Sequence, residues 1–417
     1  MVRFHLVVMG GALTAVIAAV VSVRIPRASR IDATVVAAAA AASRAASAAS
    51  SEDGGAALPQ NGRVSTGAPS MIHLDPRHTN RSPFTGPTAP NVAWTFDAGG
   101  PIAAAPAVLD DGTILVASLG GRLFALTDTG KVRFSVDLGD RGYSSPLVLG
   151  DGIFIGSDAH KFFGLTREGV VRFRLDAPGD VDTGAAPTPW GGIVFASGRV
   201  LHAAKPDGTL LWRVQARRKF YTSPAVAEDG TVYAGSQDHF LYAVAPEGRV
   251  RWRVDLGADV DSSPAVQDDG TIVVGSDKGD VVAIAPENGE IKWSAAVGGF
   301  VRGAMSLARD GTVLTGTYGP TPRLVALEPT SGAVRFRFPV PGTGASEFGI
   351  HGGPVEDAAG RLYFGAQDDH AYCLSPEGAL LWKLRTGGDV DAPLVITPKG
   401  LLLVGSDDGK LYAVGQN

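Results

Sequence analysis

Residues 262–293 read SSPAVQDDGTIVVGSDKGDVVAIAPENGEIKW, and variants of this stretch, which Asp261 precedes, recur along nearly all of the chain after residue 93. Within the stretch, short runs rich in Val, Ile and Ala alternate with turn-forming pairs such as Asp269-Gly270 and Asn288-Gly289, and no helical period is present. This alternation predicts four antiparallel strands in each unit. In this unit the expected strands are 263–266, 271–275, 281–285 and 290–295.

Two periodic signals show how often the unit recurs. Pairs of small residues follow the second expected strand, mostly 39 to 41 residues apart, at Ala117-Ser118, Gly156-Ser157, Ala196-Ser197, Gly235-Ser236, Gly275-Ser276, Gly316-Thr317, Gly365-Ala366 and Gly405-Ser406. An aromatic residue marks each fourth strand, at Trp94, Phe134, Phe173, Trp212, Trp252, Trp293, Phe336 and Trp382. Eight four-stranded units of about forty residues predict an all-β, eight-bladed propeller over residues 93–417.

The two ends of the repeat region predict how the ring closes. After Gly405-Ser406 the sequence has a third strand but no fourth, whereas residues 91–98 form a fourth strand without the first three. An incomplete blade would leave an unpaired strand edge. The strand that contains Trp94 is therefore predicted to complete the last blade.

Three segments of different composition precede the propeller. Residues 1–30 contain an apolar run long enough to cross a bilayer, which predicts a signal peptide or a membrane anchor. More basic residues follow this run than precede it, which by the positive-inside rule alone would leave the propeller in the cytoplasm. We expect export instead, to a periplasmic or membrane-anchored place in the cell envelope. Residues 31–70, rich in Ala and Ser, are predicted to be a disordered tether, and residues 71–92 an extended segment that packs on the propeller.

Charge and cysteine content exclude several classes of function. The formal charge of −5 and the isoelectric point near 5.9 predict no general attraction for nucleic acid. Cys373 is the single cysteine, so the chain forms neither an internal disulfide nor a multi-cysteine metal site. His160, His239 and His370 each follow the second strand of a different blade, too far apart to share a metal. We expect neither a metal nor a cofactor.

The repeated elements Ser-Pro-Ala, Asp-Gly-Thr, Gly-Ser, Ala-x-x-Pro and Gly-x-x-x-Trp resemble the pyrroloquinoline-quinone-type repeat. That family builds eight-bladed propellers in quinoprotein alcohol dehydrogenases and in the lipoprotein propeller of the bacterial outer-membrane barrel-assembly machinery, and the second group is the more similar. The resemblance implies that the fourth-strand tryptophans dock on the neighbouring blade. These are Trp94, Trp212, Trp252, Trp293 and Trp382.

The enzymatic branch of the family implies features that this sequence lacks. Quinoprotein dehydrogenases typically carry a vicinal cysteine pair, calcium ligands and a catalytic aspartate. Cys373 alone cannot supply the pair, and no insertion between blades is large enough for a cofactor lid. The sequence therefore predicts no enzyme, and no catalytic, cofactor-binding or metal residue is assigned.

The topology of a four-stranded meander separates two faces of the ring. The turns after strands one and three form one face, which we call the hairpin face. The turn after strand two and the links between blades form the other, the link face. The links alternate in charge around the ring, at Arg141, Tyr143, Asp180, Asp182, Arg217, Arg218, Tyr221, Asp259, Asp261, Arg302, Glu347, His351, Asp389 and Asp391. These residues are predicted to form a partner-binding rim, the alternative being a ring of neighbouring ion pairs.

Together these signals predict a non-enzymatic protein-binding or scaffolding propeller of the bacterial cell envelope. The expected partner is another envelope protein, with membrane contact through the N-terminal segment, no nucleic acid and a monomeric propeller. One alternative is a quinoprotein-like oxidoreductase. Another is a surface polysaccharide-binding or adhesion module.

Overall fold

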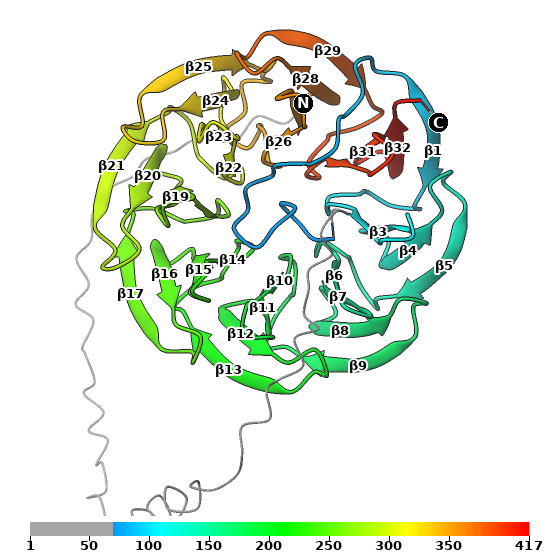
Figure 1. Ribbon diagram of the computed structural model, residues 1–417, viewed down its shortest axis with the longest axis horizontal. Helices are drawn as coiled ribbons and strands as arrows, with labels where there is room; N and C mark the ends of the chain where they lie inside the picture. The colour runs from blue at the N-terminus through cyan, green and yellow to red at the C-terminus, as the bar shows by residue number, and fades with distance from the viewer. Residues whose placement is uncertain (1–69, 417) are drawn as a thin grey trace, which may run out of the picture. The chain divides into compact units, whose positions relative to one another are not determined.

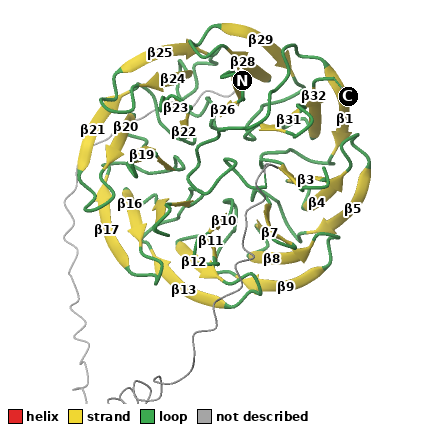
Figure 2. Cartoon of the chain, in the orientation of Figure 1, coloured by secondary structure: helices red, strands yellow, loops and turns green. Residues whose placement is uncertain are grey.

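The computed structural model describes residues 70–416, which contain eight four-stranded antiparallel sheets arranged in a ring (Figure 1). Figure 2 shows strands and loops in this part of the chain, and no helix within it is long and apolar enough to cross a membrane. The predicted all-β, eight-bladed propeller is confirmed. The predicted signal or anchor at 1–30 lies outside the described residues, and so does the predicted tether at 31–70 except for Ser70.

The first four blades follow one another along the chain, each running from its innermost to its outermost strand. Blade one has β2 (Ala107–Val108), β3 (Ile114–Ser118), β4 (Arg122–Leu126) and β5 (Val132–Asp137). Blade two has β6 (Leu147–Leu149), β7 (Gly152–Ser157), β8 (Lys161–Thr166) and β9 (Val171–Asp176). Blade three has β10 (Ala186–Pro187), β11 (Ile193–Ser197), β12 (Val200–Ala204) and β13 (Leu210–Gln215). Blade four has β14 (Ala225–Val226), β15 (Val232–Gly235), β16 (Phe240–Val244) and β17 (Val250–Asp255).

The remaining blades keep the same order, except that the last takes its outer strand from the start of the ring. Blade five has β18 (Ala265–Val266), β19 (Ile272–Gly275), β20 (Asp280–Ile284) and β21 (Ile291–Ala296). Blade six has β22 (Ser306–Leu307), β23 (Val313–Gly316), β24 (Arg323–Leu327) and β25 (Val334–Pro339). Blade seven has β26 (Val355–Glu356), β27 (Leu362–Ala366), β28 (His370–Leu374) and β29 (Leu380–Arg385). Blade eight has β30 (Val395–Ile396), β31 (Leu402–Gly405), β32 (Lys410–Val414) and β1 (Val92–Asp97).

The ring closes where β1 meets β32. The two strands pair antiparallel, with Trp94 opposite Ala413 and Phe96 opposite Leu411. In Figure 1, blue-green β1 therefore completes the red blade. The prediction that the strand of Trp94 completes the last blade is confirmed.

The small residue after each second strand makes room for the next blade. A methyl group on Gly275 would lie 2.1 Å from Cγ1 of Val301, which belongs to the link into blade six. A methyl group on Gly365 would likewise lie 2.2 Å from Cγ1 of Val390. A larger side chain would push the blades apart, so the periodic small residue is explained by packing between blades.

The outer-strand tryptophans contact the following blade. The indole N–H of Trp252 donates to the carbonyl oxygen of Pro286 at 2.8 Å, and its ring lies over Gly289. Trp94, Trp212 and Trp293 donate in the same way to Asp128, Pro246 and Pro329, at 2.9, 2.8 and 2.9 Å. Trp382 donates to Pro87 at 3.2 Å, because the third and fourth strands of blade eight are not joined by a hairpin and the chain leading into β1 takes that place.

Residues 70–87, which we call the plug segment, cross the centre of the ring (Figure 1). Their carbonyl oxygens accept backbone hydrogen bonds from the inner strands of blades two, four, five, six and seven. The donors are Val148 to Ser70, Val226 to Pro76, Val266 to Arg77, Leu307 to Thr79 and Glu356 to Asn80, at 2.7 to 3.0 Å. The segment is not extended throughout, because His73, Leu74, His78 and Asn80 have φ between 56° and 70° and turn the chain. The donors are the residues just before the first hairpin of each blade, so the segment closes the channel from the hairpin side.

Candidate functional site

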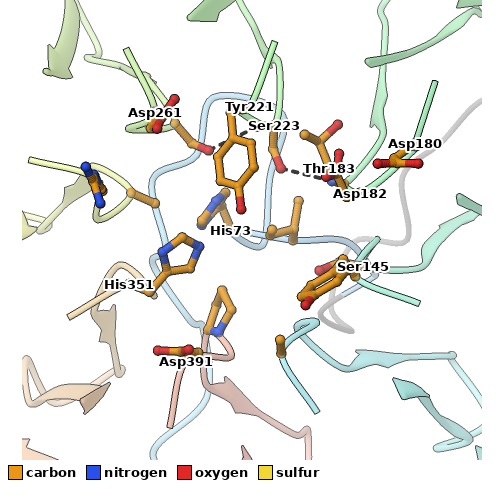
Figure 3. Close-up of a pocket in the computed structure, with 18 of the residues that line it drawn as sticks. His73, Ser145, Asp180, Asp182, Thr183, Tyr221, Ser223, Asp261, His351 and Asp391 are labelled. Atoms are coloured by element: carbon orange, nitrogen blue, oxygen red, sulfur yellow. Dashed lines mark hydrogen bonds between the residues drawn. The ribbon is translucent and has the colours of Figure 1, made fainter. Parts of the chain in front are cut away.

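A cavity of about 500 Å³ lies at the centre of the ring, and we call it the central funnel (Figure 3). Each blade contributes at least one link residue to its wall, including Ala103, Tyr143, Asp182, Tyr221, Asp261, Arg302, His351 and Asp391. Ile72 and His73 of the plug segment also line the cavity. Because the hairpin side is closed by the plug segment, the funnel opens on the link face.

The structure brings ten of the fourteen predicted rim residues into the funnel wall. They are Arg141, Tyr143, Asp180, Asp182, Tyr221, Asp261, Arg302, Glu347, His351 and Asp391. The other four, Arg217, Arg218, Asp259 and Asp389, lie outside the wall formed by the described residues. Whether these side chains bind a partner stays a prediction.

Other residues of the funnel wall were not predicted from the sequence. Asp158, Tyr318 and Gln367 come from the turn after the second strand, directly behind the small-residue pair of their blades. That position belongs to the same forty-residue period, so it could have been found by continuing the pattern one residue further. His73 could not, because it lies in a segment that has no repeat.

Several link charges form ion pairs with their neighbours. Arg141 Nε lies 3.0 Å from Asp158 Oδ2, and Lys219 Nζ lies 2.6 Å from Asp182 Oδ2. Arg302 contacts Asp277 at 2.6 Å and also pairs with Glu347. These three basic side chains thus form ion pairs of the kind that the ion-pair alternative expects.

Two funnel carboxylates have no cationic partner within hydrogen-bonding distance among residues 70–416. Asp261 and Asp391 each accept a hydrogen bond from a glutamine side chain, Gln237 and Gln367, at 3.3 Å. Burial raises the pKa of Asp261 to about 6, against the lowering effect of its hydrogen bond with Gln237. The funnel wall contains six carboxylates and three permanently charged cations, so its interior is acidic.

The acidic character continues outside the funnel in blade eight. Burial, followed by repulsion from Asp391, raises the pKa of both Asp389 and Asp407 to about 6. The backbone N–H of Asp407 donates to the carbonyl oxygen of Asp389 at 2.8 Å, which keeps the two residues together. Negative charge is therefore concentrated where blades seven and eight meet.

Histidine and tyrosine side chains also line the funnel. Burial and the neighbouring His78 hold the pKa of His73 well below its usual range. The Tyr318 hydroxyl lies 3.0 Å from Nδ1 of His351, and burial raises the pKa of Tyr318 well above its usual range. Among the described residues, a serine–histidine contact does occur between Ser197 and His202 at 2.8 Å, but both are buried in blade three, away from the funnel wall. The described part of the funnel thus presents polar recognition groups without an activated serine.

Comparison with known proteins places the fold in a family. The family model described as outer membrane protein assembly factor BamB matches residues 87–196, 196–348 and 278–415. No curated protein sequence matches the chain significantly.

Solved structures with the same fold include both enzymes and an assembly factor. The quinohemoprotein alcohol dehydrogenase from Comamonas testosteroni is 14% identical with a TM-score of 0.69, over 90% of this chain and 84% of that chain. BamB from Moraxella catarrhalis is 16% identical with a TM-score of 0.66, over 78% of this chain and 99% of that chain. A europium-containing methanol dehydrogenase is 11% identical with a TM-score of 0.70, over 82% and 91%. At these identities the likeness shows the fold alone.

The funnel wall does not fit the quinone cofactor that the repeat family implies. Among the described residues that line it there is neither a cysteine nor a tryptophan, and Cys373 is fully buried in β28. Pyrroloquinoline quinone is itself a polycarboxylate, so it would enter a cavity of its own charge sign.

Proposed function

We propose, since the chain belongs to the family described as outer membrane protein assembly factor BamB, that it is a non-enzymatic scaffold which binds another protein of the cell envelope. The link face is the proposed working surface. Family membership over residues 87–415 is the observation that carries this proposal.

The exposure of the link face supports the proposal. All residues of the link 341–347 are exposed, which makes this segment between blades six and seven available to a partner. Tyr221 is 41% exposed and has the Lys219 ammonium 4.9 Å from its ring centroid. Exposed tyrosine and arginine side chains around a concave centre are the groups that most often anchor protein interfaces.

The fold likeness to two dehydrogenases favours the oxidoreductase alternative. The acidic funnel wall, whose described residues include neither cysteine nor tryptophan, argues against it. The polysaccharide-binding alternative needs exposed aromatic platforms. All six tryptophans instead donate hydrogen bonds to backbone carbonyls of the following blade or of the plug segment. Neither alternative is adopted.

Site-specific photocrosslinking in intact cells tests the working face. A photoreactive phenylalanine at Ser346, on the exposed link, should give an adduct with one envelope protein. The matched position is Asn288, which is also exposed but lies on the hairpin face, and it should give none. Adducts from Asn288 without adducts from Ser346 would show that the working face has been assigned wrongly.

The non-enzymatic part of the proposal has its own test. Purified full-length protein supplied with calcium and pyrroloquinoline quinone should neither retain the quinone on gel filtration nor reduce a dye with alcohols. Stoichiometric retention with turnover would overturn it.

A further inference from the structure

We propose that Asp158, Asp180 and Asp182 form a calcium site in the funnel wall between blades two and three. One carboxylate oxygen from each residue lies within 4.8 Å of the others. Calcium takes carboxylate oxygens at about 2.3 to 2.6 Å, so ligands of one ion lie up to about 5 Å apart. The three side chains are therefore close enough to share an ion. The site does not depend on the proposed protein-binding function.

The buried carboxylate of Asp158 has an oxygen that nothing satisfies. Its side chain is 5% exposed, and Oδ2 pairs with Arg141 at 3.0 Å. Oδ1 is buried without a hydrogen-bond partner among the described residues, as is Oδ1 of Asp261 and of Asp391, but of these three aspartates only Asp158 has two further carboxylates within 4.8 Å in the described part of the chain. A buried charged oxygen left unpaired is costly.

Equivalent junctions between other blades show which side chain usually faces an acidic link. The sequence Asp-Val-Asp at 180–182 recurs at 259–261 and 389–391. There the facing turn residue is Gln237 or Gln367, whose side-chain N–H donates to the second aspartate of the link. At the junction of blades five and six the facing residue is an aspartate, Asp277, but the link supplies Arg302.

Blades two and three thus differ from these junctions in placing an aspartate opposite an acidic link. An ionised Asp158 cannot donate the hydrogen bond that Gln237 and Gln367 provide. A cation between the carboxylates replaces that donor. The recurrence of the link with glutamine elsewhere makes the aspartate at 158 the distinguishing feature of the site.

The basic side chains nearby do not fully neutralise the three carboxylates. Arg141 and His160 pair with Asp158 and Asp180, but their side chains are 56% and 59% exposed, so these pairs are weak. Lys219 contacts one oxygen of Asp182 and leaves the other. Three carboxylates face two permanent cations, so the cluster stays negative. Magnesium is disfavoured because it demands near-octahedral geometry and gives up water reluctantly, whereas calcium accepts irregular carboxylate sets.

Calcium titration of the full-length protein, after removal of divalent ions by a chelator, tests the site. Isothermal titration calorimetry at constant ionic strength should show one ion per chain with a Kd of about 10⁻⁵ to 10⁻³ M. Asp158→Gln should weaken binding by at least about tenfold. It should leave the circular dichroism spectrum unchanged, because glutamine occupies the equivalent place in blades four and seven. If that variant is unstable, Asp180→Asn on the more exposed link should give the same loss.

The matched control removes a carboxylate from the same funnel without touching the cluster. Asp261→Asn should bind calcium as the parent protein does. Loss of binding in this control would mean that the ion responds to general negative charge, and would overturn the site. No uptake by the parent protein at millimolar calcium, unchanged binding by Asp158→Gln, or equal affinity for magnesium would overturn it as well.

Discussion

The side chains on the two faces of the propeller make different kinds of contact. On the hairpin face, Asp111, Asp229 and Asp269 each accept a hydrogen bond from the backbone N–H of a threonine two residues later, at 2.9 Å. On the link face, the funnel-facing position changes from blade to blade, as in Tyr143 and Arg302. Where a side chain shapes its own turn, the local backbone geometry dictates the residue type, and the same residue therefore recurs from blade to blade. Where a side chain faces a cavity, the residue type depends on its neighbours and on the bound partner, and it therefore differs from blade to blade.

The largest effect should follow from removing the elements that close the ring. A chain that begins at residue 101 lacks both β1 and the plug segment, so blade eight has an open edge and the channel has no floor. It should lose its cooperative thermal transition. A chain that begins at residue 88 keeps β1 but loses the plug segment, and should melt at a lower temperature than one that begins at residue 70. Equal melting temperatures for all three, measured by circular dichroism, would contradict the closure described here.

Removal of one docking tryptophan should have the next largest effect. Trp252→Ala loses the hydrogen bond to Pro286 and the packing over Gly289, and should lower the free energy of unfolding by about 3 to 5 kcal/mol. The control on the same strand is Val250→Ala, at a position that is 37% exposed, with an expected cost below about 1 kcal/mol. Urea denaturation compares the two. Similar costs would show that blade docking does not depend on the indole.

The acidic corner of blade eight should respond to pH. The pKa of Asp389 is raised to about 6, so the folded state holds this proton more tightly than the unfolded state, whose carboxyl has a pKa near 3.8. The stability that this carboxyl contributes is complete below about pH 4 and falls as pH rises through about 6. Asp389→Asn should therefore raise the melting temperature at about pH 7.5, with a difference that shrinks toward about pH 4. A difference independent of pH would exclude titration of Asp389 as the cause.

The smallest effect is expected on the hairpin face. Changing Asp111, Asp229 and Asp269 to Asn keeps an oxygen that can accept the threonine N–H. It removes exposed ion pairs such as that between Asp111 and Arg133, and it replaces the second carboxylate oxygen, which accepts a threonine hydroxyl at Asp229 and Asp269. Each change should cost less than about 1 kcal/mol. Crosslinking from Ser346 should be unaltered. Loss of the adduct in this variant would place partner contacts on the hairpin face.

The architecture follows from the repeat pattern alone. A period of about forty residues with four apolar runs was enough to predict the blade number, the strand order and the pairing of β1 with β32, because every blade has the same order of strands and turns. Strand ends were less certain. The expected inner strand at 263–266 is paired only at Ala265–Val266, because the chain before it leaves the sheet and Ser263 lines the funnel.

The contents of the centre of the ring depend on contacts between segments that are distant in the sequence. The plug segment has no repeat and little apolar pattern, so its path across five inner strands depends on backbone hydrogen bonds that sequence does not encode by residue type. The meeting of Asp158 with Asp180 and Asp182 likewise depends on how closely blade three packs on blade two, which the contact of Val181 with Gly156 sets. The sequence predicted no metal ligand because these residues belong to separate blades. Their distance becomes short only when blade three packs against blade two.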